Sequence, residues 1–157
     1  TADLPVADEC AATLGAHGAT KVYATGDLSE SLQGVPVAAA IAGAVEGGDA
    51  PDAILFGTTY DGRDVAGRLS AKLDRTVSTN NVDLSEDGGA LVTTEPVFGG
   101  TTLVRTKFPG GGPHIVLIRP KSFAAEPSGG AAAAVAVICV GAVSGSPAGT
   151  TPYAGRG

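Results

Sequence analysis

The chain has 157 residues, of which 43% are hydrophobic and 4% are aromatic, and its formal net charge is −6. This length accommodates one domain with a buried core, and the hydrophobic content excludes a disordered chain. The acidic balance argues against a nucleic-acid partner or an anionic membrane surface, because both require a basic patch. The chain contains no Trp and no Met, so small and aliphatic side chains must fill the core.

The first half of the chain alternates between helix and strand patterns. The predicted elements are a helix at 5–14, a strand at 21–24, a helix at 35–45, a strand at 53–56 and a helix at 63–73. In the first helix, Val6, Cys10 and Leu14 recur at every fourth position, and Gly15 and Gly18 follow as stop signals. This alternation is typical of a parallel sheet covered by helices.

The strand at 53–56 is the most informative of these elements, because all four of its residues are apolar. A fully apolar strand is expected to be buried on both faces of a parallel sheet. The crevice at the carboxyl end of such a strand is where open α/β sheets bind ligands. The helix that follows has an apolar face formed by Val65, Ala66, Leu69 and Leu73.

The second half of the chain has a different pattern. The expected features are a polar turn at 83–89, two antiparallel strands within 90–108 that are interrupted at 99–100, and an apolar strand at 114–118. From Pro127 onward, Gly, Ala, Ser, Pro and Thr dominate, as in a linker or a frayed end. The sequence therefore predicts an α/β fold of three layers (α/β/α). It has a mostly parallel sheet, an antiparallel hairpin in its second half, a domain at 1–126 and a tail at 127–157.

The cysteines and the apolar runs indicate the environment of the chain. Cys10 and Cys139 lie far apart, and no CxxC or Cys/His spacing typical of zinc is present, so we expect two small buried apolar residues and no metal site. No signal peptide is visible, and the run at 131–143 is shorter than the roughly 20 residues of a transmembrane helix. We expect a bacterial-type cytoplasmic protein without membrane insertion.

Three blocks, in order and in register, resemble the amino-terminal domain of the electron transfer flavoprotein alpha subunit. They are LFGTTYDGRDVAGRLSAKL at 55–73, EPVFGGTTL at 95–103 and HIVLIRPKSFAAEPSGG at 114–130. Glu95 departs from the pattern, because the family often has Arg at that position. The resemblance covers residues 5–130. The family's opening strand and helix are largely absent ahead of Thr1, and the motifs with which its carboxy-terminal domain holds the flavin do not occur here.

This resemblance implies a heterodimer with an electron transfer flavoprotein beta subunit and one FAD, whose site is in the domain that this sequence lacks. AMP is an implied ligand of the beta subunit. The implied role is electron transport from the acyl-CoA dehydrogenases of fatty acid beta-oxidation, and from other transient dehydrogenase partners, to a quinone reductase. The chain is then expected to be a scaffold component of an electron carrier and not an enzyme, with no catalytic residue.

The candidate cofactor-binding residues lie where predicted strands end. They are Gly57, Thr58, Thr59, Gly62, Arg63 and Arg119. The turn at 57–62 lies where a nucleotide phosphate could meet a helix N-terminus, although neither a Walker motif nor GxGxxG is present. The alternative is a tight structural turn in which Asp61 caps the helix. An alternative function is accordingly a stand-alone adenine-nucleotide-binding α/β module.

The remaining chemistry-bearing residues favour structural roles. Arg119 follows an apolar strand, where its planar group suits a two-point contact with a carboxylate or a carbonyl. Neither His17 nor His114 has a nucleophile set beside it by a recognisable motif, which argues against a hydrolase. The acidic residues at 83–87 are expected to lie in a solvated loop. Phe98, beside the Gly pair at 99–100, is a candidate interface anchor.

Overall fold

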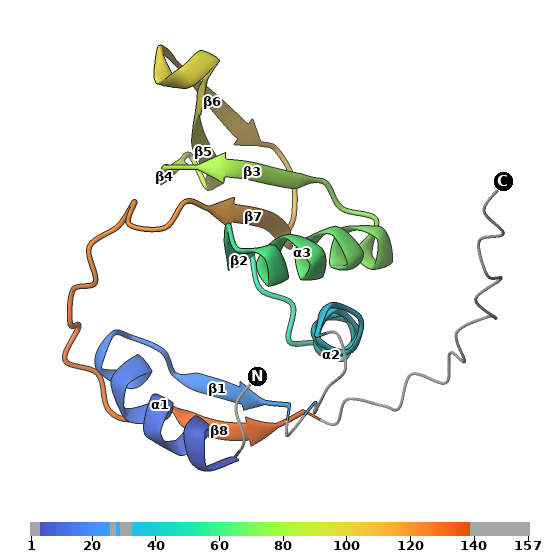
Figure 1. Ribbon diagram of the computed structural model, residues 1–157, viewed down its shortest axis with the longest axis vertical. Helices are drawn as coiled ribbons and strands as arrows, with labels where there is room; N and C mark the ends of the chain where they lie inside the picture. Colours follow the sequence, from blue (N-terminus) through green and yellow to red (C-terminus); the bar gives the residue numbers. More distant parts are fainter. Residues whose placement is uncertain (1–3, 26–27, 29–32, 139–157) are drawn as a thin grey trace, which may run out of the picture.

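A computed structural model describes residues 4–25, 28 and 33–138, and shows helices and strands in the order that Figure 1 labels. The helices are α1 (Leu4–Ala16), α2 (Gly34–Glu46) and α3 (Tyr60–Leu73). The strands are β1 (Lys21–Ala24), β2 (Ala53–Gly57), β3 (Val77–Asn81), β4 (Asp83–Asp87), β5 (Ala90–Val97), β6 (Thr102–Phe108), β7 (His114–Ile118) and β8 (Ala134–Val137). The 3-10 turn η1 (Phe98–Gly100) joins β5 to β6. The α/β class is confirmed.

The hydrophobic core lies between a parallel sheet and the helices α2 and α3. The strand order is β2–β7–β3, and Ile54 pairs with Ile115 while Val77 pairs with Ile115 on the other side. Ile115 and Leu117 of β7 contribute to this core together with Leu69 of α3. The two apolar segments predicted as strands, β2 and β7, lie side by side and pair in parallel. The partner on the far side, β3, was not predicted.

The expectation that β2 is buried on both faces is wrong. Leu55 is 53% exposed, whereas its pairing partner Val116 is fully buried. The physical reason is position: among the described residues, β2 has a neighbour on one side only, whereas β7 lies between two strands. An apolar run therefore identified both strands but did not distinguish the edge strand from the central one.

A second parallel pair joins the two ends of the described chain. β1 pairs with β8 from Lys21–Ala134 to Ala24–Val137, and Figure 1 shows α1 lying beside this pair. The expectation of a linker from Pro127 onward is therefore wrong for β8. Its short, Ala-rich sequence gives a weak strand signal, and the pairing with β1 supplies the missing hydrogen bonds.

The helix α1 has the expected position but buries a different face. Cys10 and Leu14 are exposed, while Ala11 is buried and a Cβ at Gly15 would overlap the backbone of residues 131–133. The prediction that Cys10 is buried is therefore wrong, because the small residues Ala11 and Gly15 permit the close approach of the chain before β8. Cys139 lies outside the described residues.

The second half of the chain forms an antiparallel sheet of order β4–β5–β6. The two strands within 90–108 are confirmed, as is the sharp turn at Gly99–Gly100 between them. The polar turn expected at 83–89 is wrong over residues 83–87, which form β4 and pair with β5. Only Gly88 and Gly89, both with positive φ, make the turn. Pairing with a neighbour, and not side-chain pattern, makes this polar segment a strand.

Within the described ranges, none of the helices has both the length and the apolar character that crossing a bilayer would require.

Candidate functional site at the carboxyl edge of the parallel sheet

The carboxyl ends of β2 and β7 are joined by Thr58, one of the candidate residues. Its backbone N–H donates to the carbonyl oxygen of Ile118 at 2.9 Å, and its hydroxyl donates to the same oxygen at 2.9 Å. Both donors of one residue therefore hold the last residue of β7 against the turn that follows β2. Thr58 has a structural task at this edge, and its side-chain donor is already used.

Thr59 begins the helix α3. Its side-chain oxygen accepts a hydrogen bond from the N–H of Gly62 at 3.0 Å, which satisfies one of the free donors of the first helical turn. The expectation that Asp61 caps the helix is therefore wrong, and α3 starts at Tyr60, earlier than the predicted residue 63. A Ser/Thr residue three positions before an N–H is the usual capping geometry.

Gly62 allows the turn to close. A Cβ at this position would overlap the carbonyl oxygen of Gly57, so a larger residue would force the strand end and the helix apart. Both predicted glycines thus belong to one close backbone approach. This geometry agrees with the structural alternative for the turn at 57–62.

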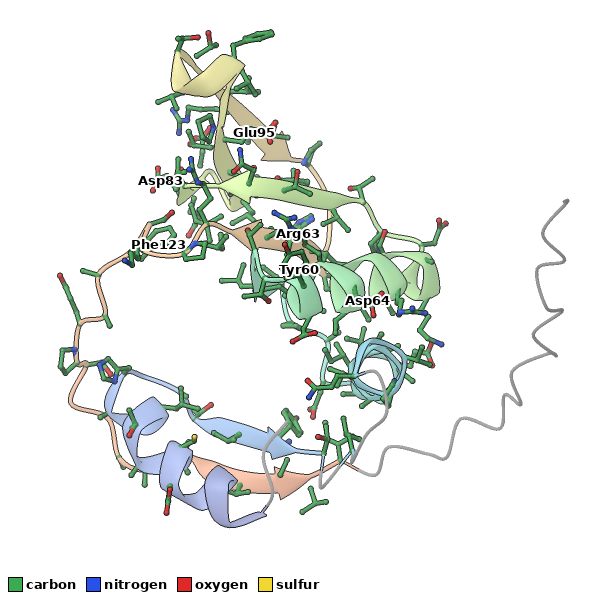
Figure 2. The ribbon with its side chains drawn as sticks, in the orientation of Figure 1. Tyr60, Arg63, Asp64, Asp83, Glu95 and Phe123 are labelled. Carbon is green, nitrogen blue, oxygen red and sulfur yellow. The ribbon has the colours of Figure 1, made fainter. Side chains whose placement is uncertain are left out.

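Arg63 lies next to a pocket of about 470 Å³ at this edge. The lining residues are Thr58, Arg63, Gly67, Val77, Thr79, Asn80 and Leu117. Arg63 is exposed and forms no ion pair with any described residue. In Figure 2 the Arg63 side chain lies between α3 and β3. Of the candidate residues, the structure brings Thr58 and Arg63 together at this pocket.

Arg119 lies at the same edge of the sheet but does not line the pocket. It follows β7 directly, as predicted, and it is exposed; its backbone N–H donates to the carbonyl oxygen of Asn81 at 2.9 Å. Its side chain forms no ion pair with the described residues. The backbone of Arg119 therefore connects β7 to β3, while its guanidinium group remains available to solvent.

Two asparagines at the end of β3 also belong to this site, and sequence analysis missed them. Asn81 is fully buried; its amide donates to the carbonyl oxygen of Leu117 at 3.1 Å, and its side-chain oxygen accepts from the Ser78 hydroxyl at 3.1 Å. Asn80 has φ 58 and donates to the carbonyl oxygen of Pro96 at 3.2 Å. The only signal was an Asn pair after a β-branched stretch, which is compatible with a loop as much as with a strand end.

The described residues at this edge do not fit the diphosphate of a flavin. A phosphate at a helix N-terminus needs free N–H groups and no competing negative charge. Here Thr59 already accepts from Gly62, and the acidic side chain of Asp61 lies in the first turn. The described part of the chain also holds no cluster of His, Cys, Asp and Glu suited to a metal ion.

A second pocket, of about 700 Å³, lies between β1, α2 and β2. Its apolar lining includes Ile41 and Leu55, and at its rim Lys21, Tyr23 and Asp49 form a hydrogen-bonded cluster. Hydrogen bonds from Tyr23 and Lys21 hold the pKa of the Asp49 carboxyl below its ordinary value. Hydrogen bonds with Tyr23 and Asp49 raise the pKa of Lys21. The cluster is thus a mutually stabilised ion pair at the surface.

Comparison with known proteins places this sequence in a family. Residues 4–142 match the profile of the electron transfer flavoprotein domain. The electron transfer flavoprotein subunit alpha of Mycobacterium tuberculosis (strain H37Rv) is 34% identical over 125 residues, which is 79% of this chain and 38% of that protein. The subunit alpha of Mycobacterium leprae is 34% identical over 121 residues, covering 76% of this chain and 36% of the relative.

Another relative gives a shorter match. The electron transfer flavoprotein subunit alpha of Thermoanaerobacterium thermosaccharolyticum is 36% identical over 72 residues, covering 45% of this chain and 22% of the relative. The matched part of this chain thus spans well under half the length of each of these relatives. Since the profile match extends from α1 to beyond β8, it includes every described sheet. The chain therefore belongs to the electron transfer flavoprotein family.

Proposed function

We propose that this chain is the scaffold domain of an electron transfer flavoprotein alpha subunit. In this role it packs on a beta subunit and supports FAD-mediated electron transfer from acyl-CoA and other dehydrogenases to a quinone reductase in the cytoplasm. The observation that carries the proposal is the family match over residues 4–142. A flavin supplies the redox chemistry, and protein domains supply position and electrostatics.

The closed turn between β2 and α3 supports a scaffold role for this chain. Thr58 and Thr59 use their hydroxyl groups within the fold, and Gly62 lies against the carbonyl of Gly57. Because the groups of this turn bind one another, the turn keeps its shape when no ligand is bound. Such a rigid turn suits a domain that supports the flavin domain and does not itself bind the cofactor. The flavin is then held outside the described residues.

The test is whether this chain alone binds FAD, and whether it binds the beta subunit. The chain is purified alone, with and without added FAD, and also together with the electron transfer flavoprotein beta subunit of the same organism. We expect the chain alone to remain colourless after gel filtration, and to elute with the beta subunit as a complex. A stoichiometric yellow complex formed by this chain alone, or separate elution of the two subunits, would overturn the proposal.

The pocket beside Arg63 favours one second candidate, a stand-alone adenine-nucleotide-binding module. Arg63 is a cation near a helix start that forms no ion pair within the described ranges, and the pocket volume of about 470 Å³ lies within the range of small-ligand sites. The capped turn and Asp61 oppose an anion there. Calorimetry with AMP and ATP separates the two functions: micromolar binding that is lost in Arg63→Ala and Thr58→Ala would favour the module.

A further inference from the structure

We infer that the tip of the β5–β6 hairpin is the surface with which this chain docks on the beta subunit, an inference that rests on the proposed function. The hairpin tip is defined here by the side chains of Phe98, Leu103 and Val104. The surface of the beta subunit that contacts the hairpin tip is apolar and carries a carboxylate that pairs with Arg105.

The hairpin tip exposes apolar side chains that no described element covers. Phe98 is 82% exposed, Leu103 is 62% exposed and Val104 is 38% exposed. The whole of β6 is exposed except Phe108, and Figure 1 shows the hairpin and its 3-10 turn projecting away from the helices. Single exposed apolar residues are ordinary, whereas a group of them at one projecting end marks an interaction site.

The backbone of the turn holds Phe98 in a fixed and uncommon conformation. Phe98 has φ 51, and the adjacent Gly99 and Gly100 also have positive φ. The Thr101 hydroxyl donates to the carbonyl oxygen of Phe98 at 2.9 Å, which closes the turn. Non-glycine residues in this region persist where the surroundings impose them, and they cluster at functional sites. A fixed turn also lowers the entropy lost when a partner binds.

The charges around the tip indicate the chemistry of the partner. Residues 96–104 carry no charged side chain, in a chain whose net charge is −6. Further along β6, Lys107 pairs with Asp87 at 2.9 Å, whereas Arg105 has a 3.4 Å hydrogen bond to the Ser85 hydroxyl and no carboxylate among the described residues. An apolar contact flanked by an uncompensated guanidinium group calls for an acidic residue on the partner.

A second copy of this chain is a poorer occupant than a different subunit. Antiparallel pairing of β6 with its own copy over the full length Thr102–Phe108 would place Arg105 opposite Arg105. Like charges directly opposite each other destabilise a strand pair. The relatives are named subunit alpha, and the beta subunit is the different chain that the proposed function requires.

The experiment measures binding of the full chain to the beta subunit of the same organism by calorimetry. Phe98→Ser and Leu103→Ser should each weaken binding by about tenfold or more, as expected for central apolar anchors. The matched controls Tyr60→Ser and Leu14→Ser remove exposed apolar surface elsewhere and should bind as the unaltered chain does. Thermal melting of each variant separates loss of binding from loss of fold.

A charge-reversal pair tests the predicted carboxylate. Arg105→Glu should weaken binding more at low salt than at high salt, because screening reduces the new repulsion. Lys72→Glu, an equal charge change on α3, should have little effect. If the unaltered chain fails to bind the beta subunit, the proposed function is overturned together with this inference. If the chain binds and Phe98→Ser binds equally well, or if Phe98→Ser instead abolishes a dimer of this chain, only the docking surface is wrong.

Discussion

The parallel sheet β2–β7–β3 and the antiparallel sheet β4–β5–β6 differ most at β7 and β6. Ile115 and Val116 of β7 are fully buried, because the strand has neighbours on both sides and α3 packs against the sheet. In β6, Thr102–Lys107 are all exposed. The core that stabilises the fold is therefore concentrated in the parallel sheet, and the outer antiparallel strand is left uncovered by the rest of the described chain.

The sharpest test of this comparison is a pair of leucine truncations. Leu69→Ala in α3 removes a fully buried side chain from the core, and should lower the free energy of unfolding by about 2–5 kcal/mol. Leu103→Ala in β6 should lower it by less than about 0.5 kcal/mol, as for other surface substitutions. Urea denaturation followed by circular dichroism measures both. Equal losses for the two variants would end the distinction between the two sheets.

A smaller effect is expected at the turn that joins β2 to α3. Thr59→Ala removes the side-chain acceptor for the Gly62 N–H, and should lower the free energy of unfolding by about 1 kcal/mol. Thr59→Ser keeps the hydroxyl and should retain most of that stability, which makes it the matched control. If both variants lose the same stability in urea denaturation, the Thr59 methyl group matters and the cap does not.

The smallest effect concerns the surface cluster of Lys21, Tyr23 and Asp49. The pKa of Asp49 is lowered from 3.8, so its contribution is present above pH 3.8 and is lost as the pH falls through the lower, folded pKa. The pKa of Lys21 is raised from 10.5, so its contribution is present below pH 10.5 and is lost as the pH rises through the higher, folded pKa.

Thermal melting across pH measures this contribution. Asp49→Asn should melt slightly below the unaltered chain between these limits and converge with it in acid, and the effect should be small because the groups are exposed. Asp52→Asn, an exposed carboxylate nearby, is the control. A difference between Asp49→Asn and the unaltered chain that persists unchanged in strong acid would show that the amide alters packing and not charge.

The comparison also explains which parts of the fold the sequence predicts. Strong signals come from the apolar runs at 53–56 and 114–118 and from the apolar face of α3. These segments contribute side chains to the core, and a core requires apolar residues. The strand β4 alternates too little to be recognised, because Asp83–Asp87 is a strand only through its pairing with β5. The exposure of Leu55 depends on which strands become neighbours, and a local pattern holds no such information.

The candidate site was predicted in location and only partly in detail. The turn at 57–62 and the position of Arg119 follow from where apolar strands end, so they were found. The choice of Thr59 over Asp61 as the cap depends on where the helix begins, which differs by two residues between the two assignments. Asn81 was missed because its amide donates to the carbonyl oxygen of Leu117, and a partner 36 residues away leaves no pattern in the residues around Asn81.

Within the described part of the chain, β2 is an edge strand with one unpaired side, and this bears on how the protein behaves when concentrated. Apolar edge strands are templates for association between identical chains, and natural proteins oppose this with charge. Residues 53–57 carry no charge, so repulsion between chains of net charge −6 is what opposes this association. Salt that screens this charge should reduce the solubility of the protein, and Leu55→Lys should restore it while leaving β7 and the core in place.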